Sequence, residues 1–233
     1  MCSVYYEPRT GRRQNAHTKE WVNSEEKQER ADLAKQIDKA QEDLTRNAIN
    51  FSSGNQANEY FEKQSKLLQE NETASKAFNY WSNLGSPTIN GLCRGRQYLE
   101  EDEIPIAQKA RETMNKWIST QKLNDDIKVY RTMDLSVFNK HLDNGVYSDK
   151  GFTATSTLFS AVEGGAPYGQ ESCWLEILVP KGVGRGAYIN EVSTFKDAEF
   201  EYLIQENSNF LLTDSKITSD GKKIYSLRLI TND

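Results

Sequence analysis

The apolar positions of this chain follow a helical spacing in its first part and an alternating spacing in its last part. Between residues 23 and 52 there is no glycine or proline, and apolar residues recur at i, i+4, i+7 and i+11, the stripe of an amphipathic helix. The stripe consists of Leu33, Ile37, Ala40 and Leu44. Ser24 is a suitable N-cap for this helix, and the segment NFSSGNQ (50–56) ends it. Residues 59–81 then predict a second helix or a helix pair.

From about residue 77 the pattern changes. Residues 104–121 predict a further helix, followed by a short strand at 125–133 and a helix at 134–145 that closes at Gly145. The apolar stripe of the helix at 104–121 is Ile106, Ala110, Met114 and Trp117. Strand-like segments dominate afterwards.

Four segments predict these later strands. They are GFTATST (151–157), CWLEILVP (173–180), AEFEYLI (198–204) and residues 210–230. The last contains an Asp220-Gly221 turn between two strands. Its second strand alternates Ile224, Ser226 and Arg228 on one face with Tyr225, Leu227 and Leu229 on the other. Helices that precede strands, instead of alternating with them, indicate an α+β fold.

Composition narrows the class of protein. With 233 residues, 36% of them hydrophobic and 27% charged, the chain has the length and polarity of a globular protein with one sizeable domain and an appendage, or two small domains. The net charge of -5 and the absence of a basic stripe argue against nucleic-acid binding. No apolar run approaches the roughly 18 residues of a membrane span, and the first 21 residues lack the apolar region of a signal peptide.

Several kinds of chemistry are not indicated. Three cysteines form an odd and sparse set, so we expect no disulfide framework and a reducing compartment. The chain has only two histidines and no Cys-x-x-Cys pair, so the sequence does not predict a metal site. No glycine-rich loop opens a helix, so neither a P-loop nor a dinucleotide-binding turn is predicted.

The segment STFKDAEFEYLI (193–204) carries two glutamates, Glu199 and Glu201, two positions apart. In a strand these carboxylates lie side by side on one face, with Phe200 and Tyr202 packed inward. Such a like-charge pair is unfavourable unless a cation or a chemical task occupies that face. A solvated sheet edge is the alternative interpretation.

Two upstream segments accompany this pair. Arg131 lies in the predicted strand VYR, and a hydroxyl-rich strand follows at DKGFTATST (149–157). In this order the three segments resemble the bacterial mono-ADP-ribosyltransferase toxins of the Arg…Ser-Thr-Ser…Glu-x-Glu class, in particular the catalytic domains of the binary actin-modifying toxins. INGLCRG (89–95) and WLEILVPKGVGRGAYI (174–189) extend the resemblance over about 75–232.

The resemblance implies an ADP-ribosyltransferase fold, with helices followed by a mixed two-sheet β-core and an NAD cleft between the sheets. It divides the chain into a helical N-terminal segment, 1–74, and a catalytic domain, 75–233. It implies that NAD is a substrate and that no metal takes part. Breaking the nicotinamide–ribose bond of NAD passes through an oxocarbenium-like transition state, which a carboxylate beside the ribose stabilises.

Residue roles follow from the same resemblance. Glu201 stabilises the developing cation, and Arg131 binds the phosphates of NAD with a planar, charged fork. Thr155 and Ser156 supply hydroxyls that hold the Glu201 carboxylate or support the cleft. Glu199 orients an incoming arginine and accepts its proton. The NAD-binding residues implied are Asn90, Arg94, Arg131, Thr132, Thr155, Ser156, Tyr168 and Glu201.

One position departs from the family pattern. If Gly151-Phe152 sets the register, the first serine of Ser-Thr-Ser is replaced by Ala154, and a one-residue slip would bring Thr157 into the motif instead. The expected activity is transfer of ADP-ribose from NAD to arginine side chains, with NAD hydrolysis as a side reaction. A weakened, non-catalytic module, such as part of a phage head protein, and a pure NAD glycohydrolase are the alternatives.

The expected partners are NAD and a target protein with an accessible arginine, for which actin is one candidate; nucleic acid and membranes are not expected partners. The expected location is that of a secreted or delivered effector that acts in the host cytosol, or of a phage-associated protein.

Overall fold

The computed structural model describes residues 4–7, 12–15, 48–96, 100–164 and 171–230. The chain divides into two units, Met1–Arg46 and Asn47–Asp233. In the first unit, β1 (Val4–Glu7) and β2 (Arg12–Asn15) form an antiparallel two-stranded sheet. The predicted helical stripe at 33–44 and its cap Ser24 lie outside the described residues.

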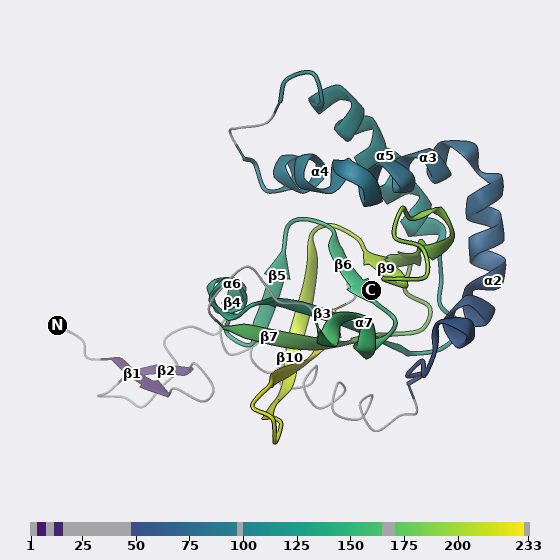
Figure 1. The fold of residues 1–233 in the computed structure, drawn as a ribbon. Helices are drawn as coiled ribbons and strands as arrows, with labels where there is room; N and C mark the ends of the chain where they lie inside the picture. Colours follow the sequence, from purple (N-terminus) through teal and green to yellow (C-terminus); the bar gives the residue numbers. More distant parts are fainter. Residues whose placement is uncertain (1–3, 8–11, 16–47, 97–99, 165–170, 231–233) are drawn as a thin grey trace. The chain divides into compact units, whose positions relative to one another are not determined.

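The second unit begins with a helical layer (Figure 1). Its elements are α2 (Gly54–Glu70), α3 (Glu72–Tyr80), the π-helical turn η1 (Trp81–Gly85), α4 (Ser86–Cys93) and α5 (Ile104–Thr120). The helix pair predicted for 59–81 is confirmed. Both helices of this pair start at a side-chain cap: Ser53 Oγ accepts from Gln56 N at 3.3 Å, and Asn71 Oδ1 accepts from Ala74 N at 3.0 Å.

The buried face of α5 differs in part from the predicted stripe. Ala110 and Met114 are buried as predicted, but Ile106 is 58% exposed and Trp117 is only partly buried. The positions that complete the stripe are Ala107 and Ile118. Each of the two new positions lies one residue, or about 100° around the helix axis, from the predicted one. Because Ala110 and Met114 are shared, the buried face of α5 is rotated only in part from the predicted face.

The strands of the second unit form one mixed sheet among the described residues, in the order β4-β5-β10-β11-β7-β3-β6-β9-β8. Their bounds are β3 (Ile127–Asp134), β4 (Leu142–Asp143), β5 (Val146–Asp149), β6 (Thr153–Ser156), β7 (Ser172–Val179), β8 (Gly186–Tyr188), β9 (Glu201–Ile204), β10 (Ser208–Ile217) and β11 (Lys223–Leu229). The short helices α6 (Leu135–His141) and α7 (Phe159–Glu163) and the 3₁₀ turn η2 (Asn190–Val192) lie between strands. The predicted α+β class is confirmed.

The sheet is nearly divided between β3 and β6. β3 pairs with β7 along its whole length, but with β6 only at Tyr130 and Ser156. The strands therefore form two parts, β4-β5-β10-β11-β7-β3 and β6-β9-β8, joined at one residue pair, which we call the seam. This arrangement accounts for the two-sheet core that the sequence predicted.

The helix predicted for 134–145 ends earlier than expected. α6 stops at His141, and the chain then forms the β4–β5 hairpin, in which Asp143 pairs with Val146. Asn144 and Gly145 have φ values of 49° and 81°, as the two-residue turn of a tight hairpin requires. Gly145 therefore closes a hairpin and not a helix.

Two apolar clusters enclose the second part of the sheet. Tyr202 and Ile204 belong to a cluster that includes Phe61 of α2, and Leu203 belongs to the cluster formed with α3, α4 and α5. β9 is thus buried on both faces, with Leu203 and Glu201 directed to the helical layer. A carboxylate at the start of such a strand is buried with it.

Candidate active site

A pocket of about 450 Å³ lies at the seam, a volume within the usual range of ligand sites. β3, β6, α7 and the start of β9 supply its walls. The lining residues are Tyr130, Arg131, Thr132, Ala154, Thr155, Ser156, Ala161, Val162, Glu199 and Glu201. Arg131, Ser156, Glu199 and Glu201, which are the four predicted catalytic residues, therefore meet in one pocket.

Arg131 spans the seam. Its Nη1 donates a hydrogen bond of 2.8 Å to the carbonyl oxygen of Ala154 on β6. Its Nε is buried and has no hydrogen-bond partner among the described residues. Arg131 also lines the pocket, and its planar, charged fork suits an anionic group of a ligand, such as a phosphate.

Glu201 is the most deeply buried acid of the pocket. It pairs with Ser156 across β6 and β9, is 4% exposed, and accepts a 3.0 Å hydrogen bond at Oε1 from Trp81 Nε1. Burial raises the pKa of Glu201 to about 7, although the hydrogen bond from Trp81 opposes that rise. The nearby charge of Glu199 raises this pKa further and that of Arg131 lowers it.

The sequence predicted that the two glutamates lie side by side on one strand. The structure does not place them so. β9 begins only at Glu201, and Phe200 has a φ of 47°, which interrupts the extended backbone between them. Both carboxylates still line the pocket, but Glu199 is exposed in the preceding turn. The protein around Glu199 removes part of its water, and this desolvation raises its pKa.

Hydrogen bonds to Asn190 and Ser82 fix the loop that carries Glu199. The side chain of Asn190 is fully buried; it donates from Nδ2 to Asp197 Oδ1 at 3.1 Å and accepts from Asp197 N at 3.0 Å. Thr194 N donates to Ser82 Oγ at 2.9 Å, which ties the loop to η1. The position of Glu199 is thus set by elements that are distant in sequence.

The hydroxyls of β6 and its end contact the backbone. Thr155 Oγ1 donates to the carbonyl of Tyr202, and Thr157 Oγ1 donates to that of Phe200 at 3.2 Å. Ser156 Oγ accepts from Leu158 N at 3.0 Å. The bonds of Thr155 and Thr157 join β6 to the segment that holds the two glutamates, whereas the bond of Ser156 stays within its own segment. Support of the Glu201 carboxylate by Ser156 stays a prediction.

The family follows from the comparison of this chain with known proteins. The sequence model of the ADP-ribosyltransferase exoenzyme family matches residues 18–231. The chain belongs to this family. The resemblance stated from its motifs is therefore confirmed, and the protein is a member of a family of NAD-using ADP-ribosyltransferase toxins.

Solved ADP-ribosyltransferases share the fold. An ADP-ribosyltransferase from Clostridium botulinum superimposes with a TM-score of 0.65 and 18% identity, covering 80% of this chain and 100% of that chain. The C3 exoenzyme from Clostridium limosum gives 0.61 and 20%, covering 80% and 98%. Vis from Vibrio splendidus, solved with agmatine, gives 0.53 and 19%, covering 78% and 88%. No curated protein matches this chain by sequence.

Two of the residues that the resemblance assigned to NAD binding, Asn90 and Arg94, are not among those that line the pocket. Asn90 exchanges two hydrogen bonds with the backbone of Phe152, at 2.8 and 3.2 Å. Arg94 forms an ion pair with Asp149 at 2.9 Å. These contacts leave no room for a side chain at Gly151, where a Cβ atom would lie 2.5 Å from Asn90 Oδ1. Contact of Asn90 and Arg94 with NAD stays a prediction.

Thr132 and Tyr168 were also assigned to NAD binding by the resemblance. Thr132 lines the pocket, but its hydroxyl donates to the carbonyl of Val162 at 2.6 Å and thereby anchors α7. Tyr168 lies outside the described residues. The motif analysis did not identify Trp81, the hydrogen-bond donor to Glu201, because no spacing rule connects a helix end with a strand 120 residues later.

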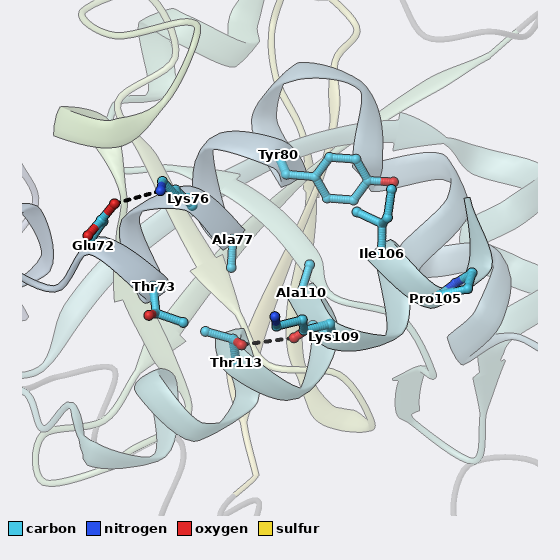
Figure 2. A pocket seen from close by; sticks show the side chains of 10 residues that line it. All are labelled: Glu72, Thr73, Lys76, Ala77, Tyr80, Pro105, Ile106, Lys109, Ala110 and Thr113. Carbon is cyan, nitrogen blue, oxygen red and sulfur yellow. Dashed lines mark hydrogen bonds and ion pairs between the residues drawn. The ribbon is translucent and has the colours of Figure 1, made fainter. Parts of the chain in front are cut away.

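A second hollow, of about 690 Å³, lies between α3 and α5 (Figure 2). Its lining includes Ala77, Tyr80 and Ala110, and its charged residues include the exposed ion pair between Lys76 and Glu72 at 2.6 Å. It contains no buried acid, so its chemistry does not match that of the smaller pocket at the seam.

Two further observations concern the described ranges alone. They contain no helix with the length and apolar character that crossing a bilayer requires. They also contain no group of three or more His, Cys, Asp or Glu side chains arranged to hold a metal ion.

Proposed function

We propose that this protein transfers ADP-ribose from NAD to an arginine side chain of a target protein, with hydrolysis of NAD as a side reaction. The observation that carries this proposal is the contrast between the two acids of the pocket, since Glu201 is buried beside Arg131 whereas Glu199 is exposed. Two acids with different environments suit two different tasks.

In the proposed reaction the bond between C1′ of the ribose and the nicotinamide nitrogen breaks, and its electron pair leaves with nicotinamide. The charged form of Glu201 stabilises the positive charge that develops on the ribose. Arg131, which lines the pocket, holds a phosphate of NAD with its planar, charged fork. A guanidinium nitrogen of the target then bonds to C1′ and gives its proton to Glu199.

The arginine acceptor is supported by chemistry and by one comparison. A guanidinium has a pKa above about 12, so it needs an anion that orients it and accepts a proton as the bond forms. Exposed Glu199 is accessible to a side chain of another protein. Agmatine, the small molecule in one structure of Vis, carries the same guanidinium group as arginine.

Ala154 was the reason to consider a non-catalytic module. The hydrogen bond from Trp81 to Glu201 supports catalysis instead, because the carboxylate has a donor that does not come from β6. The identity of the target, including actin, and the action of the protein as a delivered effector or in a phage stay predictions.

The decisive experiment measures nicotinamide release and conjugation to agmatine in the same reaction mixture. Glu201→Ala is expected to lower both by at least about 10²-fold, the scale for loss of one transition-state stabiliser. Glu199→Gln is expected to retain release but lose transfer, because glutamine cannot accept the proton. Glu112→Gln, which changes an exposed acid on α5 outside the pocket lining, is the matched control.

Each other outcome has a definite meaning. Equal loss of both reactions in Glu199→Gln would assign Glu199 to bond cleavage or to the fold and remove the basis for an arginine acceptor. Unchanged transfer would make Glu199 a solvated surface residue. Absence of nicotinamide release from the unmodified protein would support the non-catalytic alternative.

A further inference from the structure

Trp81 occupies an unusual turn of the helical layer. α3 continues at Tyr80 directly into η1, whose five residues have π-helical hydrogen bonding. Single π-helical turns are rare and occur often at functional sites, because the wider turn redirects side chains that a regular helix would place elsewhere. The indole of Trp81 is 3% exposed and packs edge-to-face on Phe152, with ring centroids 5.5 Å apart.

The polar atom of this indole has one partner. Trp81 Nε1 donates to Glu201 Oε1 at 3.0 Å, and both side chains are buried. An indole N–H is a donor only. It can stabilise a carboxylate and fix its orientation, but it can neither take up a proton from the reaction nor replace the carboxylate as an acceptor.

No hydrogen bond from the strand opposite Glu201 to its carboxylate is found among the described residues, although Ser156 of that strand pairs with Glu201 and its Oγ accepts from Leu158 N at 3.0 Å. Ala154 lies on the same face of β6 as Ser156 and has no hydroxyl. The hydroxyls of Thr155 and Thr157 donate to backbone carbonyls on the β9 side. Within the described ranges, the hydrogen bond to the Glu201 carboxylate comes from the helical layer.

We propose that Trp81 is a positioning residue for ADP-ribosyl transfer, whose indole N–H holds the Glu201 carboxylate ionised and correctly oriented. This inference rests on the proposed role of Glu201. The next residue supports it, because Ser82 Oγ donates to Asn79 O at 3.1 Å and accepts from Thr194 N at 2.9 Å. The π-turn therefore holds both the catalytic carboxylate and the loop of Glu199.

The kinetic test compares two tryptophan substitutions. Trp81→Phe keeps an aromatic ring against Phe152 and removes the N–H group. Trp117→Phe is the matched control, since Trp117 Nε1 is also buried but has no hydrogen-bond partner among the described residues. Nicotinamide release is measured from about pH 5 to about pH 9 for the wild-type protein and both variants.

For Trp81→Phe we expect kcat near pH 7 to fall by about tenfold or more, with little change in KM for NAD. The acid limb of the pH profile is expected to move up by about one to two pH units, because a lost hydrogen bond to a charged group favours the neutral form. Trp117→Phe is expected to leave both unchanged. A wild-type kcat and acid limb in Trp81→Phe would overturn the proposal.

A second measurement does not depend on activity or on the folding of a tryptophan variant. In the ¹⁵N-labelled protein, the indole resonance of Trp81 is expected to move with pH as Glu201 ionises, and this movement is expected to vanish in Glu201→Gln. The Trp117 resonance provides the reference. If the pH dependence of the Trp81 indole resonance is the same in the wild-type protein and in Glu201→Gln, the proposal is overturned. If the resonance titrates with Glu201 but the protein releases no nicotinamide, the proposed function is rejected instead.

Discussion

The ring of Phe200 packs on the α-carbon of Gly54, at the first residue of α2. A Cβ atom placed on Gly54 would lie 2.1 Å from Cε1 of that ring. Phe200 separates the two glutamates and has a φ of 47°, a conformation that is costly for a bulky side chain and that the surrounding packing must impose. The first helix of the second unit thus helps to set the geometry of the pocket.

Gly54→Ala is expected to displace the Phe200 ring. Overpacking of this kind costs about 1–3 kcal/mol in the free energy of unfolding, measured by urea denaturation. Because a displacement of about 1 Å at a reacting group can cost up to about 10²-fold in rate, transfer to agmatine is expected to fall by about tenfold or more. Gly164→Ala is the control, since no atom lies within 4 Å of a Cβ there. Equal effects of both changes would contradict this role of Gly54.

Removal of the N-terminal part tests the domain boundary predicted at residue 74. Phe51, Phe61 and Leu68 are buried in the two apolar clusters of the second unit. Deletion of residues 1–74 removes all three, and loss of each such side chain costs about 2–5 kcal/mol. We therefore expect that this deletion abolishes cooperative unfolding, whereas deletion of residues 1–46 preserves it. Cooperative unfolding of the fragment 75–233 would support the boundary predicted at residue 74.

The raised pKa of Glu201 predicts how stability depends on pH. Between its ordinary value of 4.5 and about 7, the folded protein holds a proton that the unfolded chain has lost. The free energy of unfolding should therefore fall as pH rises through this window, by a few kcal/mol, and level off above it. Glu199, whose pKa is also raised, acts in the same direction.

Urea denaturation at several pH values measures this slope. Glu201→Gln is expected to flatten it, because the glutamine amide does not titrate. The exchange Glu59→Gln on the exposed side of α2 is the control. A slope that is unchanged in Glu201→Gln would show that another group binds the proton.

Arg131→Lys tests the phosphate-binding role assigned to the Arg131 guanidinium. Lysine retains the charge but not the planar fork, and hydrogen bonds to charged groups contribute about 1.5–3 kcal/mol. KM for NAD is therefore expected to rise by about 10- to 100-fold. Arg94→Lys instead alters the ion pair with Asp149 and is expected to lower thermal stability more than NAD affinity. The reverse pattern would assign the phosphate contact to Arg94 and contradict the role given to Arg131.

Sequence patterns predicted most elements because those elements depend on local rules. Helical spacing identified α2, α3 and α5, and β-type composition identified β3, β7 and β11. Long-range packing selected Ala107 over Ile106 for the buried face of α5. The early end of α6 has a local cause, because Asn144-Gly145 forms the tight hairpin turn that the helical pattern led us to interpret as a helix end.

The site shows the same division. The residues of the three motifs meet in one pocket because adjacent strands bring Arg131, Ser156 and Glu201 together. The left-handed conformation of Phe200 could not be predicted, since phenylalanine adopts it only under tertiary constraint. The contact between Trp81 and Glu201 likewise depends on how the helical layer packs on β9.

The seam has a mechanical consequence for the pocket. Arg131 and Glu201 belong to parts of the sheet that share one residue pair, so a ladder of backbone hydrogen bonds does not fix their separation. Widening the pocket at the seam would break few backbone hydrogen bonds between β3 and β6. The hydrogen bond from Arg131 to Ala154 O links the two strands there. The residue assigned to phosphate binding therefore also supplies a hydrogen bond that resists separation of the two walls of its own site.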